Sequence, residues 1–188
     1  QVQRGVGTST NGSGAFGASI NILTDANSLK PYAEISNTIG SYNAFKHTIK
    51  FSTGEINNAF EFSGRFSKIN SDGYIDRAFS DLKSYFLQGS YKMGGTAVKV
   101  LTFGGHEKTY QSWYGVTKEQ IKENRRQNPY TYENEIDNYK QDHYQLHWNQ
   151  KVNQKWSTNL GLNYTYGRGY FEQYREDDSV ETYGDIVS

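Results

Sequence analysis

Two histidines in the last third of this sequence are the residues best suited to metal binding or catalysis. His143 and His147 lie four positions apart, with Asp142 alongside. On a helix, this spacing would bring both rings to one ligand position. The surrounding residues alternate and predict a strand, on which four residues at ~3.3 Å rise separate the rings by roughly 13 Å. We therefore expect no shared metal ion, and place both histidines in a polar row with Gln145 and Asn149.

A catalytic role for Asp142-His143 would need a connected set of functional groups. The sequence contains no nucleophile elbow, no zinc-binding helix motif and no second carboxylate pair placed to activate water. A cysteine count of 0 also excludes thiol catalysis and thiolate metal sites. We predict no catalytic residues, no metal ligands and no cofactor, and hence a protein that is not an enzyme.

A glycine-rich run near the start, Gly12-x-Gly14-x-x-Gly17, matches the fingerprint of dinucleotide-binding proteins. That fingerprint needs a strand before it and a helix after it, because the helix amino terminus binds the pyrophosphate. The segment that follows, Ser19-Ile20-Asn21-Ile22-Leu23, alternates and predicts a strand. We therefore expect the glycines to allow tight turns and close approach to neighbouring strands.

The composition is polar and yet rich in aromatic residues. Only 35% of the 188 residues are hydrophobic and the mean hydropathy is -0.85, but there are 16 Tyr, 10 Phe and 3 Trp. A disordered chain would be poor in aromatics, whereas strands with one apolar and one polar face around a wet interior give this mixture. A net charge of +0 provides no basic field to recruit nucleic acid, and no stretch of about 18 apolar residues predicts a transmembrane helix.

Alternating apolar and polar residues predict about seven strands. The predicted strands cover roughly residues 32–41, 44–54, 59–70, 82–93, 96–107, 141–152 and 155–170. The connections alternate in length, being tight at 54–58, 94–96 and 153–155 and longer at 70–81 and 107–140. This asymmetry is typical of the periplasmic turns and extracellular loops of an outer-membrane barrel.

The connection at 107–140 is where we expect binding chemistry. Thr117-Lys118-Glu119-Gln120 has the form of a capping box and predicts a short helix to about Arg126, before Asn128-Pro129. The candidate ligand-binding side chains offer guanidinium forks or aromatic faces to a bulky anion, and are Tyr110, Trp113, Tyr114, Arg125, Arg126, Tyr130 and Tyr132. The alternative is a charged, tyrosine-rich surface loop without ligand contacts.

Three features occur together in the first 24 residues: Arg4-Gly5, the run Gly12-x-Gly14-Ala15-x-Gly17, and Ile20-Asn21-Ile22 followed by Thr24. Together they resemble the end of the plug domain of TonB-dependent outer-membrane receptors, with Ala18 where that family commonly has a second glycine. The strands on either side of Asn70-Ser71-Asp72-Gly73-Tyr74 are similar to the first barrel strands of these receptors. Segments 107–116 and 128–134 resemble the long third loop of the members that take up iron complexes.

The resemblance implies an all-β fold, an antiparallel meander forming part of a 22-stranded transmembrane β-barrel, preceded by the end of the plug domain. Residues 1–24 would end the plug, 25–30 would link it, and 31–188 would form the first part of the barrel, with a long extracellular loop at about 107–140. The plug–barrel junction would contain Arg4, Gly5, Gly12, Gly14, Gly17 and Asn21 in structural roles. We expect the chain to be an internal fragment of a longer secreted precursor.

The resemblance further implies TonB-dependent active import of a scarce ligand across the Gram-negative outer membrane. The TonB–ExbB–ExbD complex would supply the energy through an upstream segment, and the other partners would be outer-membrane lipid and the extracellular ligand. A ferric siderophore or other iron complex is the leading ligand, and an oligosaccharide, haem or cobalamin are alternatives. Two alternatives lie outside this class: a soluble all-β binding or adhesion module, and an outer-membrane protease with Asp and His on the barrel rim.

Overall fold

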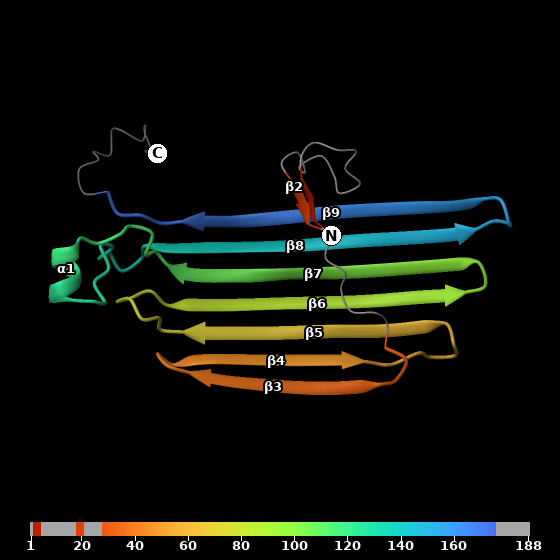
Figure 1. Ribbon diagram of the computed structural model, residues 1–188, viewed down its shortest axis with the longest axis horizontal. Coiled ribbons are helices and arrows are strands. Elements are labelled where there is room, and N and C mark those ends of the chain that lie inside the picture. Colours follow the sequence, from red (N-terminus) through yellow and green to blue (C-terminus); the bar gives the residue numbers. More distant parts are fainter. Residues whose placement is uncertain (1, 5–17, 21–27, 176–188) are drawn as a thin grey trace, which may run out of the picture.

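The computed structural model describes residues 2–4, 18–20 and 28–175 (Figure 1). Strands β1 (Val2–Arg4) and β2 (Ala18–Ile20) form a small antiparallel sheet in which Arg4 pairs with Ala18. The other residues expected at the plug–barrel junction lie outside the described residues; they are Gly5, Gly12, Gly14, Gly17 and Asn21.

Residues 32–171 form one antiparallel meander of seven strands, which confirms the predicted all-β fold. The strands are β3 (Tyr32–Gly40), β4 (Ala44–Ser52), β5 (Phe60–Ser71), β6 (Ser80–Met93), β7 (Thr96–Tyr110), β8 (Ile136–Lys151) and β9 (Ser157–Phe171). Each pairs only with its neighbours in sequence. A short helix, α1 (Lys118–Glu123), lies between β7 and β8.

Within the ranges that the structure describes, no helix is long and apolar enough to cross a membrane.

The seven predicted strands all occur, and the largest difference concerns the connection between β7 and β8. It spans 111–135 and not 107–140, because β7 continues to Tyr110 and β8 already begins at Ile136. Polar residues such as Glu107 and Asn138 suggested a loop. The ladder nevertheless continues through them, with Glu107 opposite Tyr139 and Tyr110 opposite Ile136.

The tight connections use left-handed backbone, which glycine and asparagine adopt most readily. Tyr42 and Asn43, with φ of 60° and 51°, form the turn between β3 and β4. Gly94 has a φ of 58° and forms with Gly95 the two-residue connection between β6 and β7, as is common in β-hairpins. In the turn before β9, the Asn153 side chain accepts hydrogen bonds from following backbone amides.

The register brings most of the large apolar residues of the seven strands to the same side of the sheet. One row across it contains Ala33, Phe51, Gly64, Leu87, Thr102, Tyr144 and Tyr164, and the next contains Phe62, Gly89, Val100, Leu146 and Leu162. We call this side the apolar face. Its large side chains are widely exposed, for example Ile35 at 70%, Phe62 at 52% and Leu162 at 54%.

The opposite side, which we call the polar face, carries the intervening residues and contains most of the buried side chains of the sheet. Thr48, Ser52, Glu61 and Gln88 are between 3% and 6% exposed. Thr48 and Ser67 are joined by a hydrogen bond of 2.8 Å between their hydroxyl oxygens. The sheet therefore buries polar side chains on one face while apolar side chains remain exposed on the other.

Glu61 ties the segment that enters β3 to the polar face. Its Oε1 accepts hydrogen bonds from Ser52 Oγ at 2.9 Å and from the backbone amide of Ser28 at 3.2 Å. Its Oε2 lies 3.5 Å from the donor Ser90 Oγ. The chain immediately before β3 thus lies on the polar side of the sheet.

Gly73 should be the turn glycine least tolerant of substitution. Its φ is +76°, and a Cβ there would collide with the carbonyl oxygen of Ala78, whereas Gly94, at +58°, has no heavy atom within 4 Å of that position. Gly94→Ala should cost about 1 kcal/mol through backbone conformation alone, and Gly73→Ala at least ~1 kcal/mol more. Equilibrium unfolding of the full-length protein in urea would measure both, and equal losses would contradict the proposed collision.

Candidate binding site at the long-loop end

Three segments gather at one end of the sheet: 72–79, 111–135 with α1, and 172–175 (Figure 1, left). The tight connections at 53–59, 94–95 and 152–156 lie at the other end. The described loops that could carry recognition chemistry are therefore concentrated at a single end of the strands.

A buried asparagine joins the 72–79 and 111–135 segments. Asn128 is 3% exposed; its Nδ2 donates to the carbonyl oxygens of Asp76 and Gln111, both at 3.0 Å, and its Oδ1 accepts from the amide of Tyr130. The Arg77 guanidinium adds hydrogen bonds to the carbonyls of Tyr130 at 2.7 Å and Asn128 at 3.3 Å. These contacts satisfy backbone groups that the loops would otherwise leave unpaired.

Two of the predicted ligand-binding tyrosines form the packed base of these loops. Tyr110 and Tyr130 are each 5% exposed and cluster with Ile136 and Phe79. Burial, together with nearby Tyr114, raises the pKa of the Tyr130 phenol above its ordinary value. Tyr110 and Tyr130 therefore support the loops and present little surface to a ligand from solvent.

The predicted capping box is present at α1. Thr117 Oγ1 accepts from the amide of Gln120 at 3.2 Å, and Gln120 Oε1 accepts from the amide of Thr117 at 2.8 Å. The prediction that the helix continues to about Arg126 is wrong, because it ends at Glu123. Asn124 follows the helix; its Nδ2 donates a hydrogen bond to Asp76 Oδ2, and its Oδ1 accepts one from the amide of Arg126.

The two predicted arginines differ in their surroundings. Arg126 Nε lies 3.3 Å from Asp76 Oδ1 and donates to the carbonyl of Tyr74 at 2.9 Å, and its guanidinium lies 5.9 Å from the centre of the Tyr42 ring. Arg125 is exposed and makes no ion pair with any residue in the described part of the chain. Arg126 thus holds the loops together, and Arg125 is the arginine open to a ligand.

The three remaining predicted aromatic residues are exposed, and each packs against another ring. Trp113, Tyr114 and Tyr132 are 62%, 63% and 43% exposed. The supporting rings, in the same order, are Phe171 at 6.4 Å, Tyr130 at 5.3 Å and Tyr174 at 5.1 Å between centroids. This support orients the exposed rings before any ligand arrives, which lowers the entropic cost of binding.

Sequence reasoning missed the polar residues on which this arrangement depends. The carboxylate of buried Glu135 accepts from the amides of Tyr132 and Tyr174, at 3.2 Å and 3.4 Å. Gln111 is 1% exposed and its Nε2 donates to the carbonyl of Glu172 at 2.8 Å. Both residues directly adjoin a strand end, but that position alone does not distinguish a buried glutamate from a solvated one.

The histidines of β8 lie on the polar face, as the alternation predicted. His143 stacks on Phe103 at 4.5 Å and its Nδ1 lies 2.9 Å from Thr165 Oγ1. Asp142 is on the opposite, apolar face, so the two neighbours do not cooperate. Among the described residues, no group of three His, Cys, Asp or Glu side chains could hold a metal ion.

No protein-family model matches this sequence, and no curated protein matches it either. The resemblance to TonB-dependent receptors is therefore a proposal, carried by the chain's own residues.

Asn128→Asp should loosen the long loops. A carboxylate cannot donate to the carbonyls of Asp76 and Gln111, so the buried side chain would face two acceptors at a cost of ~2–3 kcal/mol. We expect faster cleavage by trypsin in the segment 118–126, measured by mass spectrometry of the fragments. Asn134→Asp, an exposed change of the same kind in the same loop, should leave the rate unchanged; if the two variants behave alike, Asn128 does not hold the loops.

Proposed function

We propose that the seven-stranded sheet is part of the wall of a transmembrane β-barrel in a TonB-dependent receptor of the Gram-negative outer membrane. The observation that carries the proposal is the reversal of burial, with Ile35 and Leu162 exposed on one face and Ser52 and Glu61 buried on the other. A soluble sheet buries its apolar face, whereas a barrel wall turns it toward lipid and encloses a polar interior.

The dimensions of the apolar face fit a bilayer. On β5 the apolar positions run from Phe60 to Phe66, about 20 Å at ~3.3 Å per residue, close to the ~25 Å apolar band of outer-membrane barrels. Seven strands at ~4.8 Å make the face roughly 30 Å wide, so the apolar band covers about 600 Å², the upper end of the patches that soluble monomers expose. Strands β6 to β9, with 14 to 16 residues, exceed the ~9–11 residues needed to cross.

Aromatic residues flank the apolar band at both ends. Phe60, Tyr91 and Trp148 belong to one row near the tight turns, and Phe66, Tyr85 and Tyr166 to another nearer the long loops. Amphipathic rings at the two boundaries of an apolar band are typical of membrane interfaces.

Among the residues that the structure describes, β3 and β9 each pair with one neighbour, so the sheet has an open edge at each of these strands. Unpaired edges are avoided in barrels by closure, so further strands would complete the wall. The hydrogen bond from the Ser28 amide to Glu61 brings residues 28–31, just before β3, to the polar side, where the plug of such a receptor would lie. This position supports assigning residues 28–30 to the connection between plug and barrel.

Within this reading, the long-loop end faces the outside and the protein imports a ligand with energy supplied through the TonB–ExbB–ExbD complex. Exposed Arg125 and the supported rings of Trp113 and Tyr114 belong to the same 111–135 segment, and together they suit a bulky anionic chelate, so a ferric siderophore remains the leading ligand. The same exposed rings would also stack on sugars, so an oligosaccharide is the second candidate.

Contact of Trp148 with lipid tests the barrel assignment. In bilayers whose acyl chains carry bromine on their upper carbons, the fluorescence of the full-length protein should be quenched, because Trp148 lies on the apolar face. Trp148→Phe should reduce the quenched fraction, and Trp113→Phe, in the long loop, should not. A soluble sandwich would keep Trp148 under another protein layer, so no change in quenching with Trp148→Phe would overturn the proposal.

Ligand class is tested by titrating the detergent-solubilised protein separately with ferric siderophores and with oligosaccharides. Saturable quenching of the fluorescence by an iron chelate supports iron import. Arg125→Gln should then weaken the affinity about tenfold, and Trp113→Phe should reduce the amplitude of quenching. Lys155→Gln removes a charge in the connection between β8 and β9, at the opposite end of the sheet, and is the matched control. A response to sugars alone would replace the iron assignment with glycan import.

A further inference from the structure

Six side chains form a basic row across the apolar face near the long-loop end. The row consists of His47, Lys68, Lys83, His106, Lys140 and Arg168, and each is directly opposite the next on the neighbouring strand. Five of the six line a shallow groove of about 540 Å³, and Arg168 completes the row on β9.

The centre of the row juxtaposes like charges. Lys68 and Lys83 are cross-strand partners, an arrangement that destabilises a sheet when both side chains are charged. Neither lysine has an ion-pair partner within the described ranges. The positive charge at this position is thus not neutralised by a direct ion pair with a described residue.

Of the two nearby carboxylates in the described part of the chain, Asp142 forms ion pairs within the row and Asp81 does not. Asp142 lies 3.8 Å from Lys140 Nζ and 3.9 Å from Arg168 Nη1, and it accepts a hydrogen bond from the Tyr85 hydroxyl at 2.9 Å. Asp81 is on the same face as Lys83, two residues along β6, but forms no ion pair with it. The half of the row around Lys68 and Lys83 therefore attracts anions more strongly than the half around Asp142.

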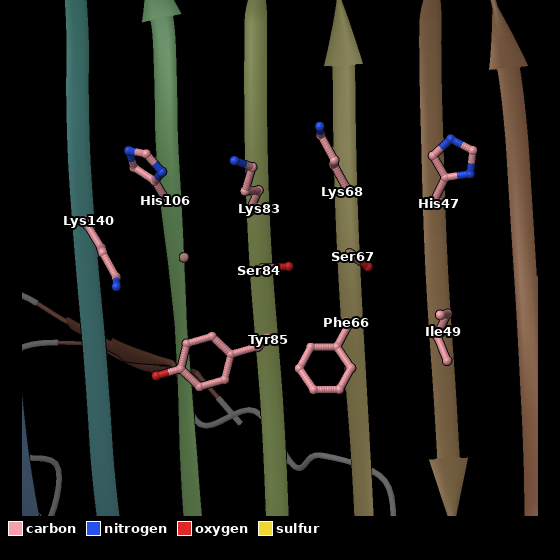
Figure 2. A pocket seen from close by; sticks show the side chains of 11 residues that line it. His47, Ile49, Phe66, Ser67, Lys68, Lys83, Ser84, Tyr85, His106 and Lys140 are labelled. Carbon is pink, nitrogen blue, oxygen red and sulfur yellow. The ribbon is translucent and has the colours of Figure 1, made fainter.

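An apolar surface begins directly beside these lysines. Ile49, Phe66 and Tyr85 form the next row toward the tight turns. Figure 2 shows the rings of Phe66 and Tyr85 side by side, with the Lys68 and Lys83 side chains extending away from them along the strands. One molecule could thus place an anionic group at the lysines and hydrocarbon on the rings.

We propose that Lys68 and Lys83 bind the phosphate monoester headgroup of a lipid whose acyl chains pack on Ile49, Phe66 and Tyr85. This inference rests on the proposed function, because only a lipid-facing wall presents this face to acyl chains. A phosphate monoester carries between one and two negative charges at neutral pH and offers several acceptor oxygens, which matches two ammonium groups better than the single charge of a phosphodiester. The basic row thus defines a lipid site separate from the ligand site on the loops.

The test compares phosphatidic acid, a phosphate monoester, with phosphatidylglycerol and phosphatidylcholine of the same acyl chains, added in mixed micelles to the full-length protein. Native mass spectrometry should detect preferential retention of phosphatidic acid. The double variant Lys68→Gln with Lys83→Gln should weaken that retention by about tenfold or more. Lys46→Gln with Lys99→Gln, the same charge change on the polar face, should not.

Thermal unfolding separates lipid binding from a structural role. Without added lipid, the Lys68–Lys83 double variant should unfold at the same temperature as the wild type or a higher one, because a repulsive pair is removed. With phosphatidic acid, the wild type should gain more stability than the variant. Equal retention of the three lipids, or equal loss in both double variants, would overturn the proposal; if Trp148 is still quenched by brominated lipid, the barrel assignment survives that failure.

Discussion

Strict antiparallel register is the constraint on which the rest of this structure depends. Because side chains alternate along each strand, a shift of one residue between neighbours would move a whole strand's apolar set to the other face. The pairing of Ala33, Phe51 and Leu87 with their neighbours keeps the apolar sets in phase from β3 to β9. The exposed apolar band, the buried polar face and the basic row all follow from that phase.

The long loops depend on the same register in a less direct way. Extension of the β7–β8 ladder to Tyr110 and Ile136 holds the two ends of the 111–135 segment close together. The side chains of Asn128 and Arg77 then donate hydrogen bonds to backbone carbonyls of the loop, and Arg126 forms an ion pair with Asp76. The exposed rings therefore lie on loops whose backbone is hydrogen-bonded and continuous with the strands.

Alternation in the sequence was sufficient to predict all seven strands, because a strand with one apolar face repeats every two residues whatever its neighbours are. It was insufficient where polar residues such as Glu107 and Asn138 continue a ladder. The sequence predicted which types of residue form the candidate site. It did not predict that Tyr110 and Tyr130 are buried while Trp113 and Tyr114 are exposed, because burial depends on contacts with the distant 72–79 segment. The Lys68–Lys83 pair could not be predicted either, because which residues lie opposite each other depends on the strand register.

The meander has a consequence for the order in which the sheet assembles. Each strand pairs with its immediate predecessor, so most hairpins close over a few residues, whereas β8 can join β7 only after closure of the 111–135 connection. Loop-closure entropy rises with length and makes this step costlier by ~2 kcal/mol than closure of the Gly94-Gly95 turn. Strands β3 to β7 and the hairpin of β8 and β9 should accordingly form as two preassembled pieces, and their docking should be the slowest step in building this part of the sheet.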